Sequence, residues 1–142
     1  MQLFIGGAFS GKRKIVKEKI VENCWLSSYQ GDLLEAWKVK WKKNSTLVLE
    51  GWEKWLSSRI KLEESDERIR NEFQSILQLL KEEELKRADE IVLIMLEVGR
   101  GIVPISKDER RLRDLAGWIL QDATELADEV NYVWHGLSKR LK

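Results

Sequence analysis

Residues 6–12 read Gly-Gly-Ala-Phe-Ser-Gly-Lys and stand between an apolar run at residues 2–5 and an amphipathic stretch that follows them. Glycine at this density favours neither helix nor strand, so the segment is expected to be a loop between a short buried strand and a helix. A G-x-x-x-x-G-K loop in that context turns backbone N–H groups around phosphate oxygens, and the helix N-terminus adds partial positive charge. The sequence therefore predicts a phosphate-binding loop in which Lys12 reaches the β- and γ-phosphates of a nucleoside triphosphate.

The residues expected to contact the nucleotide share this loop and the first turn after it, and they are Gly6, Gly7, Ala8, Phe9, Ser10, Gly11, Lys12 and Arg13. Arg13 departs from the usual pattern, in which a Ser or Thr hydroxyl at this position ligates Mg²⁺. A guanidinium group cannot coordinate a cation, although it can contact phosphate. The motif therefore favours phosphate binding with weakened metal-assisted transfer. The alternative interpretation is a tight strand-to-helix turn that carries an ordinary solvated lysine.

Apolar runs and amphipathic stretches alternate along the rest of the chain, and their periodicity predicts the remaining elements. Further strands are expected at residues 24–29, 45–50, 91–96 and 129–134, and helices at residues 12–22, 32–42, 52–58, 66–87 and 108–126. The run at 91–96 is nearly all apolar, which is typical of a strand buried on both faces of a parallel sheet. Strands that alternate with helices predict a single α/β domain over residues 1–142, with a mostly parallel P-loop sheet and helices on both faces.

Two carboxylates follow predicted strands, since Glu50 closes the third strand and Glu97 comes directly after the fourth. The carboxyl ends of parallel strands share one edge of the sheet, which is where open α/β sheets bind ligands. Glu50 is expected either to hold Mg²⁺, directly or through water, or to be a solvent-facing residue at a strand end. The candidate catalytic residues are therefore Lys12, Glu50 and Glu97, with Mg²⁺ at Glu50 accompanying ATP or GTP.

Charge and composition narrow the class of protein. The 25 Lys and Arg residues nearly balance the 24 Asp and Glu residues, whereas dedicated nucleic-acid binders usually carry a clear basic excess. The single cysteine, Cys24, cannot form an intramolecular disulfide, which suits a reducing compartment. No segment resembles a signal peptide, and no apolar run approaches the roughly 18–20 residues that span a bilayer. We therefore expect a cytoplasmic protein without a nucleic-acid or membrane partner.

Tryptophan is unusually frequent, with seven residues in the chain. Three of them precede the third predicted strand and either belong to the core or a subunit interface, or stack on a ligand: Trp25, Trp37 and Trp41. Three others occupy apolar positions of predicted helices and are expected to pack in the core: Trp52, Trp55 and Trp118.

The second half of the chain resembles a known family. Residues 97–104 read E-V-G-R-G-I-V-P, which is very similar to the E-V-G-x-G-I-V-P signature of the bifunctional adenosylcobinamide kinase/adenosylcobinamide-phosphate guanylyltransferase family of cobalamin biosynthesis. Residues 110–117 resemble its R-x-x-R-D-x-x-G helix, and residues 127–130 match the A-D-E-V that opens its last strand. The phosphate loop is similar to the family's G-G-A-R-S-G-K-S, and residues 47–56 resemble its strand and following W-L segment.

The resemblance implies a P-loop sheet, ATP or GTP as phosphoryl donor, and the corrinoid adenosylcobinamide as acceptor. It also implies GTP as nucleotidyl donor in a second reaction, and a homo-oligomer that is typically a trimer. The chain departs from the family pattern at three positions. Phe9 and Arg13 replace the loop's usual Arg and Ser, and Leu96 stands where an Asn usually precedes the glutamate.

The segment before the strand that ends at Glu50 is much shorter than in the family. In the family this segment carries an H-x-x-x-R-P-like motif, whose histidine takes GMP covalently and so divides nucleotidyl transfer into two displacements. The only histidine here, His135, lies far along the chain and is expected to be a structural or surface residue. The resemblance therefore implies a kinase-like protein without guanylyltransferase activity. The alternative is a catalytically silent homologue that binds nucleotide or scaffolds an oligomer.

Overall fold

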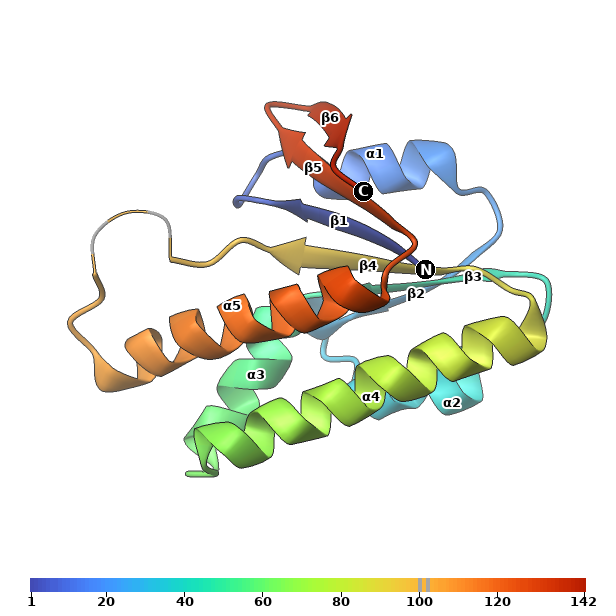
Figure 1. The fold of residues 1–142 in the computed structure, drawn as a ribbon. Helices are drawn as coiled ribbons and strands as arrows, with labels where there is room; N and C mark the ends of the chain where they lie inside the picture. Colours follow the sequence, from blue (N-terminus) through green and yellow to red (C-terminus); the bar gives the residue numbers. More distant parts are fainter. Residues whose placement is uncertain (100, 102) are drawn as a thin grey trace.

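The computed structural model describes residues 1–99, 101 and 103–142. These residues form a sheet of six strands in the order β2-β3-β4-β1-β5-β6 (Figure 1). The strands are β1 (Gln2–Gly6), β2 (Asn23–Ser27), β3 (Thr46–Glu50), β4 (Ile91–Leu96), β5 (Glu129–Trp134) and β6 (Leu137–Arg140). All neighbouring strands run parallel except β5 and β6, which are antiparallel. The predicted α/β fold with a mostly parallel sheet is confirmed.

Helices cover both faces of the sheet, as predicted. They are α1 (Lys12–Lys19), α2 (Trp37–Lys40), α3 (Trp52–Lys61), α4 (Asp66–Arg87) and α5 (Lys107–Leu126). Figure 1 shows α1 on one face and the other helices on the opposite face, where α4 and α5 lie along the sheet. Within the described residues, no helix is long and apolar enough to cross a membrane.

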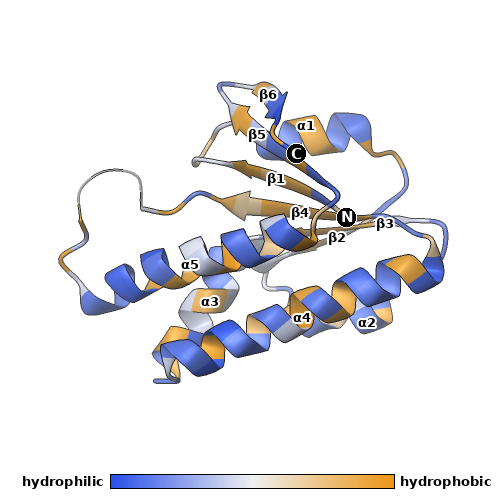
Figure 2. Cartoon of the chain, viewed as in Figure 1, coloured by the Kyte–Doolittle hydropathy of each residue, from blue (hydrophilic) through white to orange (hydrophobic). Residues whose placement is uncertain are grey.

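The core is divided into two layers because successive side chains of a strand point to opposite faces of the sheet. In β3, Leu47 and Leu49 pack against the α3–α5 side, whereas Val48 packs with Val16 of α1. All four side chains are fully buried. Figure 2 shows the same division, with apolar strands in the middle and hydrophilic residues on the outer faces of the helices. Strands β1, β3 and β4 therefore lie buried between α1 and the helices of the opposite face.

The two long helices begin at serine caps. The Ser65 hydroxyl accepts a hydrogen bond from the Arg68 backbone N–H at 3.2 Å, and the Ser106 hydroxyl accepts one from Glu109 at 3.4 Å. Such a cap satisfies one of the N–H groups that the first helical turn leaves without a partner. Helices α4 and α5 therefore begin directly after Ser65 and Ser106.

The expected helix at residues 32–42 is wrong. A 3₁₀ turn at Leu34–Ala36 and the single turn of α2 take its place. The carboxylate of Asp32, the first residue of that stretch, accepts a hydrogen bond from the Ser27 backbone at 3.0 Å and pairs with Lys40 at 2.8 Å. Trp37 and Trp41 are buried in the core, which supports the packing interpretation for these two tryptophans. Burial of both indoles holds the chain in this compact, irregular path.

Three smaller differences concern the end of α1, the presence of β6 and the side chain of Trp118. Helix α1 ends at Lys19, three residues before the expected end, because Ile20 is buried with an extended backbone. Strand β6 is absent from the sequence-based expectation; it follows a tight turn in which His135 and Gly136 have φ of 49° and 75°, as in common two-residue hairpins. Trp118 remains 38% exposed beside the Arg70 guanidinium, so its assignment to the core is wrong.

Candidate functional site

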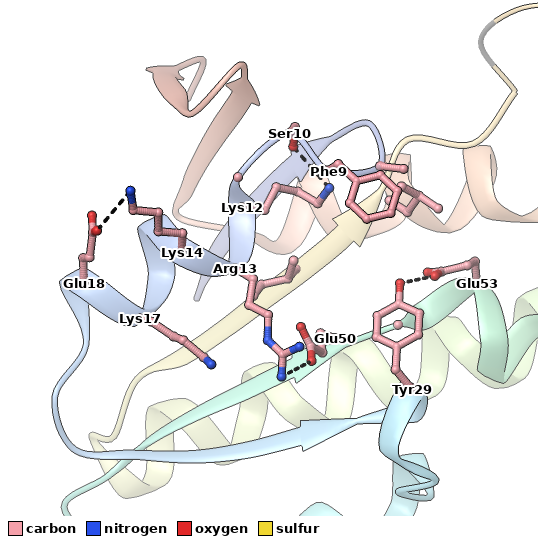
Figure 3. A pocket seen from close by; sticks show the side chains of 15 residues that line it. Phe9, Ser10, Lys12, Arg13, Lys14, Lys17, Glu18, Tyr29, Glu50 and Glu53 are labelled. Atoms are coloured by element: carbon pink, nitrogen blue, oxygen red, sulfur yellow. Dashed lines mark hydrogen bonds and ion pairs between the residues drawn. The ribbon is translucent and has the colours of Figure 1, made fainter.

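A cavity of about 870 Å³ opens at the carboxyl edge of the sheet, between the β1–α1 loop and the end of β3 (Figure 3). Its walls include the backbone of residues 8–11, the first turns of α1, and Glu50 at the end of β3. Leu96 at the end of β4 contributes an apolar wall. The structure thus brings the predicted phosphate loop and Glu50 to one cavity at the sheet edge where α/β proteins bind ligands.

The loop is braced against the turn between β5 and β6. The Gly136 backbone N–H donates to the Ser10 carbonyl at 2.7 Å. A Cβ added at Gly6 would lie 2.3 Å from the Val133 carbonyl oxygen, and one at Gly11 would lie 3.0 Å from the Gly136 Cα. Gly11 also has a φ of 99°, a conformation that favours glycine. Close backbone approach therefore explains two of the three glycines of the motif.

Replacing Gly6 with alanine is expected to lower the free energy of unfolding by about 1–3 kcal/mol, because the new methyl group overlaps a backbone oxygen that cannot rotate away. Gly7→Ala is the matched control, since a Cβ there would meet nothing within 4 Å. Urea unfolding of both variants measures the difference. Equal stabilities would show that the loop and β5 are not in contact in solution.

Lys12 is folded back over the loop. Its Nζ donates to the carbonyl oxygens of Gly6 at 2.9 Å and Gly7 at 2.6 Å, and to the Ser10 hydroxyl at 3.3 Å. Burial lowers the pKa of Lys12, and the nearby carboxylates of Glu53 and Glu97 oppose that shift. The ammonium group therefore lies at the mouth of the loop with hydrogen-bond partners that a phosphate oxygen can replace.

Arg13 points from α1 toward the end of β3, where its guanidinium pairs with Glu50 at 3.4 Å (Figure 3). Glu50 is only 3% exposed, and its Oε1 makes no hydrogen bond with any described residue. The guanidinium carbon of Arg13 also lies 5.6 Å from the centre of the Trp25 ring, within the range of a cation–π contact. The expectation that Glu50 is a solvent-facing residue is therefore wrong. Its role as a magnesium ligand stays a prediction.

Glu97 directly follows β4, which lies between β3 and β1 in the sheet. Its backbone N–H donates to the Gly6 carbonyl at 3.0 Å, and its carboxylate accepts a hydrogen bond from the Tyr132 hydroxyl at 2.9 Å. The charge of this carboxylate acts on Lys12. Lys12, Glu50 and Glu97 thus share one edge of the sheet, with Glu97 between Glu50 and Lys12 along the strand order.

Tyr29 and Glu53 also line the cavity, and neither was predicted as a site residue. The Tyr29 hydroxyl donates a hydrogen bond to the Glu53 carboxylate, and burial together with that carboxylate raises the pKa of the phenol. Tyr29 belongs to the 3₁₀ turn Ser28–Gln30, which takes the last residues of the expected second strand. The strand ends early because Ser28 leaves the sheet and its hydroxyl donates to the Gly51 carbonyl at 2.6 Å.

The remaining candidates lie elsewhere. His135 is exposed in the β5–β6 turn, as expected of a surface residue, and does not line the cavity. Of the glycine-rich stretch at 97–104, Arg100 and Ile102 lie outside the described residues. In the described part of the chain, no three His, Cys, Asp or Glu side chains are grouped so as to hold a metal ion.

Comparison with known proteins identifies the same family as the sequence resemblance. A family model described as "Cobinamide kinase / cobinamide phosphate guanyltransferase" matches residues 23–141. The chain is 32% identical over 88 residues to the bifunctional adenosylcobalamin biosynthesis protein CobP of Pseudomonas aeruginosa, a match that covers 62% of this chain and 48% of CobP.

Two shorter matches have higher sequence identity. The bifunctional adenosylcobalamin biosynthesis proteins CobU of Escherichia coli and of Salmonella typhimurium are each 42% identical over 52 residues, which is 37% of this chain and 29% of each relative. The chain therefore spans half or less of the length of the curated relatives it matches.

Proposed function

The chain belongs to the cobinamide kinase/cobinamide phosphate guanyltransferase family of cobalamin biosynthesis, and we propose that it binds a nucleoside triphosphate and acts as a kinase on adenosylcobinamide. The observation that carries the proposal is the shared position of Lys12 and Glu50 at one cavity, beside a glycine loop between β1 and α1. The glycine loop lies before the segment that matches the family model, because that match begins at residue 23.

Phosphoryl transfer depends chiefly on positioning and on stabilising charge, so a small set of residues suffices for the chemistry. Lys12 and the backbone N–H groups of the loop hold the β- and γ-phosphates of ATP or GTP. Lys12 exchanges its loop carbonyl partners for phosphate oxygens when the nucleotide enters. Glu97, next to Lys12 at the sheet edge, orients the acceptor. The apolar part of the cavity, which includes Leu96, faces the corrinoid.

We propose further that the guanylyltransferase step is lost. Covalent nucleotidyl transfer through the enzyme needs a nucleophile at the site. The short path between β2 and β3 holds no histidine, and His135 is in a turn outside the cavity. A homo-oligomer, with a trimer as the specific form, is proposed from the resemblance alone.

A catalytically silent homologue is the alternative, and Arg13 is the observation that favours it. Its guanidinium occupies the approach to Glu50, where an active P-loop kinase has a hydroxyl and a metal ion. Such a protein would bind nucleotide and contribute to an oligomer without turnover.

Incubation with adenosylcobinamide and γ-labelled ATP or GTP tests the proposal. We expect labelled adenosylcobinamide phosphate from the wild-type protein. We expect no labelled protein after incubation with α-labelled GTP, because the covalent GMP intermediate requires the missing nucleophile. Nucleotide binding without phosphorylated product would support the silent homologue, and failure to bind either nucleotide would contradict both interpretations.

A further inference from the structure

The first turn of α1 places a permanently charged side chain at the position where P-loop proteins ligate a divalent metal ion. Arg13 follows Lys12 directly, and its guanidinium Nη2 lies 3.4 Å from Oε1 of Glu50. A Mg²⁺ ion at this position would need oxygen ligands at about 2.0–2.1 Å in near-octahedral geometry.

The residues present do not fit an ordinary P-loop magnesium site. The hydroxyl that normally ligates the ion after the loop lysine is missing, because the position is Arg13. The carboxylate oxygen that would be the second protein ligand already faces a guanidinium group. A divalent cation on the same oxygen would be repelled by that positive charge at close range.

The buried carboxylate of Glu50 depends on Arg13 to compensate its negative charge. Its side chain is 4% exposed, and Oε1 is buried without a hydrogen bond to any described residue. A buried carboxylate without compensation is costly, so the nearby guanidinium is the group that stabilises it. The pair therefore fixes Arg13 in the cavity rather than leaving it in solvent.

A second contact holds the same side chain. Trp25 of β2 presents its ring to the Arg13 guanidinium carbon at 5.6 Å, and Lys17 Nζ lies at the same distance from that ring. Arg13 is thus placed between a carboxylate from β3 and an aromatic ring from β2, while 46% of its side chain remains exposed to the cavity. The exposed part is what a ligand can reach.

A guanidinium group is suited to bridge a carboxylate and a phosphate. It carries five N–H donors in a planar fork, so one edge can face Glu50 while another donates to a phosphate oxygen. The cavity holds further positive charge, since its lining includes the cations Lys12, Arg13, Lys14 and Lys17 and the carboxylates Glu18, Glu50 and Glu53. Of these carboxylates, Glu18 pairs with Lys14 and Glu53 accepts from Tyr29.

We propose that Arg13, held by Glu50 and Trp25, takes the place of the divalent cation, so that this site binds the phosphates of a nucleoside di- or triphosphate without metal. The inference rests on the proposed nucleotide binding and specifies its ionic requirement. Arg13 contacts the phosphate directly, whereas Glu50 and Trp25 are positioning residues.

Isothermal titration with ATP and GTP, in EDTA and in Mg²⁺, tests the inference on wild type and Arg13→Ser. We expect the wild-type dissociation constant to differ less than about threefold between the two buffers. Arg13→Ser restores the hydroxyl and exposes Glu50, so it should bind at least tenfold more weakly in EDTA and regain affinity when Mg²⁺ is added.

Lys14→Ser is the matched control, because it removes the same charge from the same helical turn of α1 at a residue that does not contact Glu50. It should weaken binding equally in both buffers and create no magnesium dependence. Wild-type binding that needs Mg²⁺ would overturn this inference, support magnesium at Glu50, and leave the proposed nucleotide binding intact. Absence of wild-type binding in both buffers would overturn the proposed nucleotide binding and this inference with it.

Discussion

Replacing Lys12 with alanine is expected to weaken the proposed binding of ATP and GTP about 10- to 100-fold. A hydrogen bond to a charged partner contributes about 1.5–3 kcal/mol, and each 1.4 kcal/mol is a factor of ten in affinity. In the free protein the Lys12 ammonium group is held at the loop by the carbonyl oxygens of Gly6 and Gly7. Its side chain is therefore already at the site, and little ordering is needed when phosphate arrives. Isothermal titration of both proteins in one buffer measures the change.

Lys86→Ala is the control for loss of a lysine. Lys86 lies in the last turn of α4, where its Nζ is 3.6 Å from Glu83 and its side chain is 70% exposed. Its removal should leave nucleotide affinity unchanged. Urea unfolding must accompany the titration, because Lys12→Ala also leaves loop carbonyl groups without a partner. Equal affinity of Lys12→Ala and wild type would show that the nucleotide binds elsewhere.

The pH dependence of binding gives a second readout of the same residue. Burial lowers the pKa of Lys12 from the usual 10.5, so its positive charge is lost at a lower pH than that of an exposed lysine. Affinity for nucleotide should therefore fall as the pH rises through that lowered pKa. Lys12→Ala should lack this alkaline decline, while the Lys86→Ala control should retain it.

The sequence predicted the elements whose pattern is local. Strand β4 is an uninterrupted apolar run, and α4 and α5 each follow a serine that caps them, so their bounds in the structure differ from expectation by at most one residue. The loop between β1 and α1 belongs to the same class, since glycine spacing and the flanking elements define it, whereas its binding of phosphate stays a prediction. Such features depend on neighbours in the chain and can be read from one sequence.

Features that depend on distant contacts were not predicted. The helix expected at 32–42 fails because Asp32 bonds to the backbone of Ser27 and the indole of Trp55 donates to the Asp32 carbonyl at 2.8 Å. Strand β6 was missed for a different reason: within the described residues it pairs only with the adjacent β5, through a two-residue turn at His135 and Gly136. No hydrophobic period marks a short, fully exposed strand, so only the turn chemistry could have indicated it.

The residues of the candidate site were predicted in part, and the contact between Arg13 and Glu50 was not predicted. The sequence places Lys12 and Glu50 at one sheet edge because both follow parallel strands. It does not show that Arg13 turns toward Glu50. Which strand a side chain of α1 faces can be worked out only once the order of the strands in the sheet is known. The ion pair changes the expected chemistry, because a carboxylate that faces a guanidinium is a different group from one that faces solvent.

Replacing Phe73 with alanine is expected to lower the free energy of unfolding by about 3–5 kcal/mol. Phe73 is 1% exposed in α4, and its ring centre lies 6.2 Å from that of Trp52, which begins α3 after Glu50 and Gly51. The cavity left by the ring is enclosed by helices and cannot collapse easily. Urea denaturation followed by circular dichroism measures the change. Phe73→Leu, with an expected loss under about 1.5 kcal/mol, keeps the test decisive where the alanine variant does not fold.

Phe9→Ala is the matched substitution at a fully exposed phenylalanine. The Phe9 ring is fully exposed at the cavity mouth, on a backbone with φ of 56°. Because no apolar surface is uncovered when this ring is removed, the free energy of unfolding should change by less than about 0.5 kcal/mol. The comparison therefore separates a phenylalanine that stabilises the fold from one that only borders the site. A loss at Phe9 as large as the loss at Phe73 would contradict the exposed position of the loop, and with it the open cavity on which the proposed nucleotide binding depends.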